Sequence, residues 1–190
     1  MVSNKVALDR GLLACAGRLR LVCVAATGTN NVDLEAAREL GIAVTNVTGY
    51  ATPAVAQHVF ALILALSTRL LDYARSVRSG AWARSDRFCL LDHPIRELAG
   101  RTFGILGYGE LGRAVAAIGR AFGMRVLIAQ RPGGPAQPGR IPLLELLPGV
   151  DVLSLHLPLA DNTRDLIGAN ELRLGRGRAG VCLRTVLRVS

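Results

Sequence analysis

The segment 101–112, RTFGILGYGELG, places a short apolar run directly before three glycines spaced as Gly107-x-Gly109-x-x-Gly112. The apolar run predicts a strand, and the pattern after the glycines predicts a helix. Each glycine then has a physical reason: Gly107 permits a tight turn, Gly109 lets the backbone approach a pyrophosphate, and Gly112 lets the helix pack close to the strand. The motif predicts the phosphate-binding turn of a dinucleotide fold, with a plain glycine-rich turn as the alternative.

The residues after this turn predict a parallel α/β block. A helix is expected over Leu111–Phe122, and its N-terminus would offer unpaired N–H groups and a partial positive charge to the phosphates. Strands are expected over Arg125–Ala129 and Val150–Leu155. A proline- and glycine-rich loop, Gln130–Pro142, and a short helix, Leu143–Leu147, lie between them.

An earlier α/β block precedes this one. Leu21–Ala25 predicts a buried strand, Asp33 caps a helix that runs to Leu40, and Gly41 ends that helix before a strand over Ile42–Thr45. A strand, helix and strand in this order imply parallel pairing through a right-handed crossover. The expected fold class is α/β, with Rossmann-like, doubly wound parallel sheets.

A long apolar helix is expected between the two blocks. It begins at Pro53 and runs to about Arg78, where Ser79-Gly80 breaks it. His58, within this helix, is interpreted as a packed histidine and not as a catalytic one. The segment 81–94 is expected to be irregular, with Trp82 and Phe88 as the aromatic side chains available to anchor it.

Composition excludes several classes of protein. Hydrophobic residues make up 51% of the chain but aromatic residues only 4%, which suits an aliphatic core in parallel sheets covered on both faces. The apolar run Val59–Leu66 is far shorter than the roughly 20 residues of a membrane span. The N-terminus lacks the hydrophobic region of a signal peptide. The four cysteines are scattered without metal-ligand spacing. We therefore expect a cytoplasmic protein with reduced thiols, no metal site and no membrane partner.

The net charge of +9 does not indicate a nucleic-acid partner. Five arginines and one acidic residue fall in residues 171–190, which form a divergent basic tail. No aromatic residue alternates with these arginines, so the stacking expected of a single-strand binder is missing. The tail shows neither a helix nor a strand period.

Three separated runs resemble the NAD(P)-dependent D-2-hydroxyacid dehydrogenases: VAATGTNNVDLEAARELGIAVTNVTGYATPAVAQHVFALILAL, FCLLDHPIRELAGRTFGILGYGELG and DVLSLHLPLADNTRDLI. Within that family the chain is most similar to the glycerate dehydrogenases, also called hydroxypyruvate reductases. The resemblance implies that residues 1–78 are a partial, flavodoxin-like substrate domain with an interdomain helix. It implies that residues 79–96 are an arm used to dimerise, and that residues 97–170 are a partial NAD(P)-binding Rossmann domain.

The resemblance also implies roles for individual residues. The loop Ala26-Thr27-Gly28 would hold the substrate carboxylate, with Thr27 near the nicotinamide. The glycine turn would contact the pyrophosphate through Gly107, Tyr108, Gly109, Glu110, Leu111 and Gly112. The Glu110 side chain should point outward, because a carboxylate beside a pyrophosphate is unfavourable, so that only its N–H serves. His156, Pro158 and Thr163 would line the cofactor site.

The second cofactor signal lies eighteen residues after Gly112. Where an acidic residue would hold the ribose 2′-hydroxyl of NAD, this chain has Gln130 followed by Arg131. An arginine can pair with a 2′-phosphate, whereas a carboxylate would repel it. We therefore expect a preference for NADP(H), with NAD(H) as the alternative.

The chain departs from the family beyond residue 172. The family's substrate-binding arginine, its acid/base histidine and the glutamate that orients it all lie beyond the motif of His156 and Pro158. The arginine belongs to an Asn-x-Ala-Arg-Gly-Gly stretch expected soon after Glu171-Leu172, where this chain reads RLGRGRAGVCLRTVLRVS and matches none of the three. No catalytic residue is therefore assigned. The chain is expected to be truncated at both ends, with a frameshift or a natural truncation as alternatives for the tail.

The sequence leaves two functions open. The first is hydride transfer between NAD(P) and a small 2-hydroxy or 2-keto acid, such as glycerate or hydroxypyruvate, by a full-length homodimeric parent, with this fragment itself inactive. The second is a non-catalytic dinucleotide-binding remnant or interaction protein. A methyltransferase with a similar glycine turn is the least favoured hypothesis.

Overall fold

The computed structural model describes the chain except residues 3–4, 132, 159–161, 176–180 and 184–190. The described chain forms two compact units, one over Met1–Ala51 and one that begins at Thr52. Residues 52–78 are grouped with the second unit. The resemblance implied a partial substrate domain over residues 1–78 that includes an interdomain helix, and that division stays a prediction. Each unit is described by itself.

The first unit is a strand–helix–strand motif with one additional helix. Its strands β1 (Leu21–Val24) and β2 (Ala43–Asn46) pair in parallel, and α2 (Leu34–Glu39) connects them. The Asp33 carboxylate caps α2 by accepting the Ala36 N–H at 2.8 Å, as predicted. The helix α1 (Arg10–Cys15) was not predicted.

The second unit is built on a four-stranded parallel sheet, in the order β4-β3-β5-β6. These strands span Arg125–Ile128, Thr102–Leu106, Val152–Leu155 and Val181–Leu183, in that order across the sheet. The helices of the unit are α3 (Thr52–Ser67), α4 (Leu70–Arg78), α5 (Glu110–Ala121), α6 (Leu143–Leu146) and α7 (Ala169–Gly175), with a 3-10 turn over Leu147–Gly149. The parallel α/β fold expected from the sequence is confirmed.

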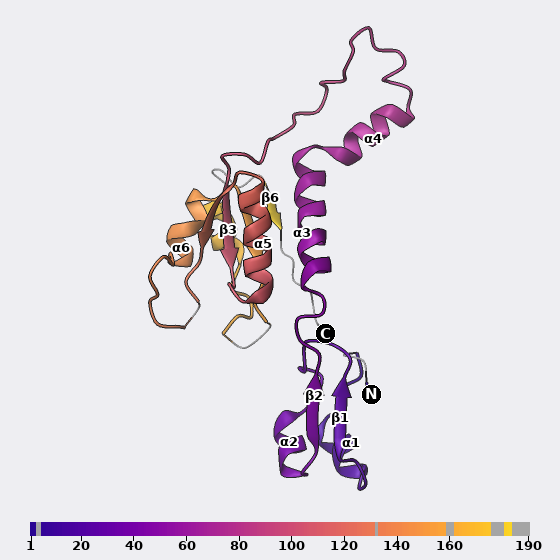
Figure 1. Cartoon of the computed structure of the whole chain (residues 1–190), viewed down its shortest axis with the longest axis vertical. Helices are drawn as coiled ribbons and strands as arrows, with labels where there is room; N and C mark the ends of the chain where they lie inside the picture. Colours follow the sequence, from indigo (N-terminus) through magenta and orange to yellow (C-terminus); the bar gives the residue numbers. More distant parts are fainter. Residues whose placement is uncertain (3–4, 132, 159–161, 176–180, 184–190) are drawn as a thin grey trace. The chain divides into compact units, whose positions relative to one another are not determined.

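Side chains alternate along β3 between two apolar cores. Phe103 and Ile105 pack with residues of α3 and α5, whereas Leu106 packs with Leu146 of α6 and with residues of the 3-10 turn. Figure 1 shows α5 and α6 on opposite sides of β3. A Cβ on Gly104 would lie 2.9 Å from Leu146, so glycine lets α6 approach this strand closely. Helices therefore cover both faces of the sheet, as a doubly wound fold requires.

The predicted continuous helix over residues 53–78 is wrong. The chain breaks into α3 and α4, which are bent by 60°. Arg69 lies between them with φ 54° and ψ 36°, in the left-handed region that non-glycine residues rarely adopt. Its side chain pairs with Asp72 at 2.8 Å, in the first turn of α4. No single described helix is long and apolar enough to cross a membrane, although the bent pair α3 and α4 passes that test together.

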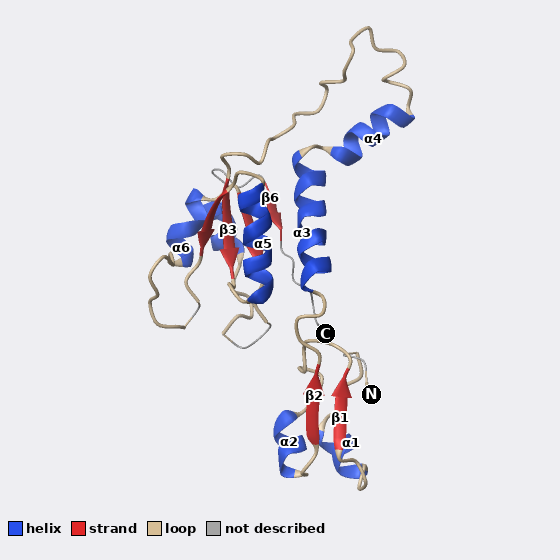
Figure 2. Ribbon diagram, in the orientation of Figure 1, coloured by secondary structure: helices blue, strands red, loops and turns tan. Residues whose placement is uncertain are grey.

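The segment between α4 and β3 is loop throughout (Figure 2). The expectation that Trp82 and Phe88 anchor this segment is wrong, because their side chains are 54% and 92% exposed. The segment is instead fastened by His93, whose carbonyl accepts the Tyr73 hydroxyl at 2.7 Å and whose ring meets the Tyr73 ring edge-on. His58 is exposed on α3, so its interpretation as a packed histidine is also wrong.

Part of the basic tail has regular structure, contrary to expectation. The helix α7 runs into it, and β6 pairs in parallel with β5. The arginines of the tail other than Arg173 lie outside the described residues.

The strained backbone at Arg69 generates a prediction. Arg69→Gly should leave the free energy of unfolding unchanged or raise it by up to about 1 kcal/mol, because glycine adopts a positive φ without steric cost. Arg75→Gly is the matched control, since Arg75 also pairs with Asp72 but lies inside α4. It should lower the free energy of unfolding by about 1 kcal/mol. Urea denaturation measures both, and equal losses in the two variants would contradict the assignment of strain to Arg69.

Candidate functional site

The glycine turn joins β3 to α5 by two close backbone contacts. Gly107 has φ 95°, and a Cβ there would lie 2.5 Å from the carbonyl oxygen of His156, the residue after β5. A Cβ on Gly112 would lie 2.1 Å from the carbonyl oxygen of Gly107. The tight turn and the close helix packing that the sequence predicted are both present. They require glycine at both positions.

Gly109 differs from the other two glycines because a Cβ there would meet no atom within 4 Å. It is the N-cap of α5, and no side chain among the described residues caps it. The first helical bond at this end is donated by the Arg113 N–H to the Gly109 carbonyl at 3.0 Å. The N–H groups of Glu110, Leu111 and Gly112 therefore start the helix without a side-chain cap, which is the arrangement that receives anions.

The Glu110 side chain contacts a residue of another helix. It is exposed and accepts the Thr52 hydroxyl, at the start of α3, at 2.9 Å. The carboxylate is therefore held by a neighbouring helix, and the outward orientation of this side chain relative to a pyrophosphate stays a prediction. Thr52 was not singled out from the sequence, because its contact with Glu110 is purely tertiary.

The end of β4 carries no carboxylate. The Gln130 side chain is used within its own loop: it donates to the carbonyls of Gly134 and Pro135 and accepts the Gln137 N–H at 3.3 Å. The Arg131 side chain is exposed, and the described residues give it no hydrogen bond or ion pair. Of the two residues predicted here, only Arg131 presents unused donors.

His156 lies just beyond β5, against Gly107. Its Nε2 is 2.9 Å from the hydroxyl of the buried Ser154, and its Nδ1 is buried with no hydrogen-bond partner among the described residues. Burial lowers the pKa of His156 to about 4. The imidazole is therefore neutral at physiological pH, with one ring nitrogen that has no partner among the described residues.

Beyond His156, the Thr163 hydroxyl donates to the Pro158 carbonyl at 2.7 Å. Gly107 to Gly112 and His156 thus gather at the carboxyl ends of β3 and β5, where such sheets bind ligands. The ligand contacts predicted for these residues stay predictions.

The predicted carboxylate loop belongs to the first unit. Ala26 is buried and its carbonyl accepts the Val47 N–H at 3.2 Å, while the Thr27 carbonyl accepts the Asn46 side chain at 2.7 Å. The loop follows β1 at its carboxyl end, with Thr27 exposed and Gly28 half-buried. The structure holds this loop in place from β2, and its role toward substrate stays a prediction.

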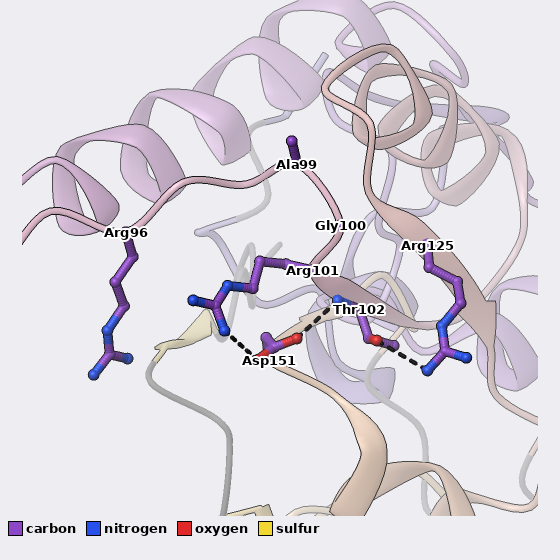
Figure 3. A pocket seen from close by; sticks show the side chains of 7 residues that line it. All are labelled: Arg96, Ala99, Gly100, Arg101, Thr102, Arg125 and Asp151. Atoms are coloured by element: carbon purple, nitrogen blue, oxygen red, sulfur yellow. Dashed lines mark hydrogen bonds and ion pairs between the residues drawn. The ribbon is translucent and has the colours of Figure 1, made fainter.

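A basic pocket lies at the opposite, amino end of the second sheet (Figure 3). Its volume is about 770 Å³, and it is lined by Arg96, Ala99, Gly100, Arg101, Thr102, Arg125 and Asp151. Four of these residues bond to one another: Asp151 accepts from the Thr102 N–H at 2.8 Å and from Arg101 at 3.4 Å, and Arg125 donates to the Thr102 hydroxyl at 3.1 Å. We interpret this hydrogen-bond network as a structural link between the amino ends of neighbouring strands. Among the described residues, no group of three His, Cys, Asp or Glu side chains could hold a metal ion.

The two kinds of glycine in the turn predict different mutational outcomes. Gly112→Ala should lower the free energy of unfolding by about 3 kcal/mol or more, because its Cβ would overlap a backbone oxygen that cannot move aside. Gly109→Ala is the matched control, and its cost should stay within about 1 kcal/mol because its φ of −76° suits alanine and the space is open. Thermal and urea melts measure both, and a Gly112→Ala variant as stable as Gly109→Ala would contradict the packing argument.

The buried imidazole predicts a pH dependence of stability. The folded-state pKa of His156, about 4, lies below the ordinary value of 6.5, so the unfolded chain takes up a proton first as the pH falls. The contribution of His156 to the free energy of unfolding is fully present above pH 6.5 and is lost as the pH falls from 6.5 to 4. At pH 5 the loss is about 1–2 kcal/mol. His156→Gln should flatten this part of the profile in denaturant melts. His58→Gln is the control, because His58 is exposed, and it should keep the wild-type slope of unfolding free energy against pH. An unchanged slope in His156→Gln would contradict the argument.

A family model described as the D-isomer specific 2-hydroxyacid dehydrogenase NAD binding domain matches residues 60–181. Among curated proteins, the glycerate dehydrogenase of Methylorubrum extorquens is 42% identical over 170 residues, covering 90% of this chain and 53% of that protein. The glyoxylate reductase of Aeropyrum pernix is 43% identical over 176 residues, covering 88% and 52%. The chain thus spans about half the length of the curated relatives it matches.

Solved structures agree with these matches. D-lactate dehydrogenase of Aquifex aeolicus, complexed with NAD and lactic acid, superposes with a TM-score of 0.77 at 33% identity, covering 91% of this chain and 52% of that one. An acyclic imino acid reductase in complex with NADPH superposes with a TM-score of 0.82 at 25% identity, covering 94% and 57%. The glycine turn, the doubly wound sheet and these matches lead to one conclusion: the chain belongs to the D-2-hydroxyacid dehydrogenase family.

Proposed function

We propose that this chain supplies the dinucleotide-binding part of an oxidoreductase that transfers a hydride between a nicotinamide and C2 of a small 2-hydroxy or 2-keto acid. The proposal rests on the N-terminus of α5, which has no side-chain cap and where Gly109 leaves open space. This helix end presents N–H groups and no side chain to an incoming phosphate. When bound, the nicotinamide would accept or donate the hydride. The chain's own residues would hold and orient the dinucleotide.

The residues present fit such a cofactor. The N–H groups of Glu110, Leu111 and Gly112 would receive the pyrophosphate, while Thr52 holds the Glu110 carboxylate aside. The unsatisfied Nδ1 of His156 is a buried polar atom that a bound ligand could pair with. Orienting the dinucleotide in this way would contribute to the reaction through positioning.

Glycerate and hydroxypyruvate are the proposed substrates of the full-length protein. The similarity to a protein named glycerate dehydrogenase supports this choice, and the similarity to a protein named glyoxylate reductase makes glyoxylate the alternative. The loop Ala26-Thr27-Gly28 is the proposed seat of the substrate carboxylate.

We propose that the chain prefers NADP(H) over NAD(H). Arg131 stands just after β4 with an exposed guanidinium that no described carboxylate neutralises, and Gln130 replaces the acidic residue that would repel a 2′-phosphate. NAD(H) binding remains available, because the pyrophosphate contacts are common to both dinucleotides.

We also propose that this chain binds the dinucleotide without turning substrate over. Acid/base catalysis needs a group whose pKa lies near the working pH, and the pKa of His156 is too low. His93 is engaged with Tyr73 and Ser76, and His58 is exposed on α3. A non-catalytic dinucleotide-binding protein is the second candidate function, favoured by the same three observations.

The arm over residues 79–96 is the proposed homodimer contact of the full-length protein. Its side chains Trp82, Phe88, Leu91 and Ile95 are more than half exposed, at 54%, 92%, 69% and 56%. An exposed apolar set of this kind is typical of a protein–protein contact. The cytoplasmic location expected from the cysteines and the N-terminus stays a prediction.

Binding of the two reduced dinucleotides tests the proposed function. Nicotinamide fluorescence titrations should show NADPH binding more tightly than NADH. Arg131→Ala should weaken NADPH binding about tenfold and leave NADH unchanged, because only the 2′-phosphate is lost as a partner. Gly109→Ala should weaken both dinucleotides equally, because the pyrophosphate is common to them.

Absence of binding by both dinucleotides would contradict the proposed function, and tighter binding of NADH would contradict the preference alone. The same samples, given hydroxypyruvate or glyoxylate with NADPH, should show no loss of absorbance of the reduced nicotinamide. Measurable oxidation of NADPH would contradict the proposal that this chain is inactive.

A further inference from the structure

Arg140 is a charged residue that no sequence motif singles out. It ends the loop that begins at Gln130, and its guanidinium carbon lies 4.8 Å from the centroid of the Tyr108 ring. Tyr108 is the middle residue of the Gly107-x-Gly109 turn. A side chain from the far end of the loop is therefore placed beside the phosphate-binding turn.

The loop is closed at its base by backbone hydrogen bonds. The Gln130 N–H donates to the Ile141 carbonyl at 2.7 Å, and the Ile141 N–H donates to the Ile128 carbonyl at 3.0 Å. Arg131 and Arg140 each lie one residue from this closure. The two arginines consequently enter and leave the loop at the same place, above the carboxyl end of β4.

The contact between Arg140 and Tyr108 is a cation–π contact, which uses none of the guanidinium N–H donors in a hydrogen bond. A cation over an aromatic ring is held by the ring quadrupole. The N–H donors of a guanidinium lie in its plane and suit two phosphate oxygens at once. Within the described residues, the Arg140 side chain has no hydrogen bond and no carboxylate partner.

Tyr108 makes further contacts that hold it in position beneath Arg140. Its carbonyl accepts from the Arg113 guanidinium at 3.3 Å, and its hydroxyl oxygen accepts from Arg120 at 3.4 Å. Its ring packs, partly buried, against the core between α3, α5 and β3. The position of the Arg140 guanidinium is therefore set by the core of the unit.

We propose that Arg140 is a second specificity-determining residue of the dinucleotide site and pairs, together with Arg131, with the 2′-phosphate of NADP(H). The proposal rests on the proposed dinucleotide function and deepens it. The end of β4 is where the adenosine ribose is read in such folds, and a dianionic phosphate has oxygens enough for two guanidinium groups. Arg131 approaches from the start of the loop and Arg140 from its end.

Matched arginine variants test the proposal by nucleotide titration. Arg140→Gln should weaken NADPH binding about tenfold and leave NADH binding unchanged, because only one of the two ligands carries the 2′-phosphate. Arg140→Lys should restore part of the NADPH affinity, since it keeps the charge but loses the planar donors. Arg173→Gln on α7, which removes an exposed arginine outside the loop and the turn, should change neither affinity. Adenosine 2′-monophosphate should bind wild type more tightly than Arg140→Gln, which isolates the phosphate from the pyrophosphate contacts.

The outcomes separate this proposal from the one it rests on. If wild type prefers NADPH and Arg140→Gln loses affinity for both dinucleotides equally, Arg140 serves only to position Tyr108, and the proposal is overturned. An Arg140→Gln variant with unchanged NADPH affinity also overturns it, with the proposed function intact. If wild type binds neither dinucleotide, the proposed function itself fails. Melting of each variant near the wild-type temperature excludes misfolding as the cause of lost affinity.

Discussion

The close approach of α5 to β3 is the constraint on which the rest of the site depends. A Cβ on Gly112 would overlap the Gly107 carbonyl, and a Cβ on Gly107 would overlap the His156 carbonyl, so the turn fits only when both residues are glycine. Because of this contact, the first N–H groups of α5 lie at the carboxyl end of β3. It also leaves Gly109 facing open space, so the packing of the core and the opening of the anion site have the same cause.

The arginines of the second unit are used differently at the two ends of its sheet. At the amino end, Arg101 and Arg125 bond to Asp151 and Thr102, and the charge is used within the fold (Figure 3). At the carboxyl end, Arg131 has no partner among the described residues, and Arg140 has only its cation–π contact with Tyr108. Arginine donors without a partner among the described residues are thus present at the carboxyl end, where the dinucleotide is proposed to bind, as well as at Arg96 at the amino end.

Local signals predicted most of the fold, and tertiary contacts account for what was missed. The Asp33 cap and the glycine spacing each act within a few residues, so sequence alone located α2 and the turn before α5. The break at Arg69 carries no glycine or proline, so the pattern of residues 53–78 predicts one helix. Arg140 meets Tyr108 across 32 positions of sequence, and no local pattern indicates such a contact. The same holds for Glu110, whose partner Thr52 comes from another helix.

The most direct test of dinucleotide binding at the glycine turn is an amide NMR titration of the isotope-labelled chain with NADPH. Chemical shifts should change most at residues 107–113, at the base of the 130–141 loop and at His156, with the largest changes at the first N–H groups of α5. Shifts confined to the pocket around Arg96, Arg101 and Arg125, or no shifts at saturating NADPH, would contradict binding at the turn. In either case Gly107 and Gly112 would serve only to pack α5 against β3.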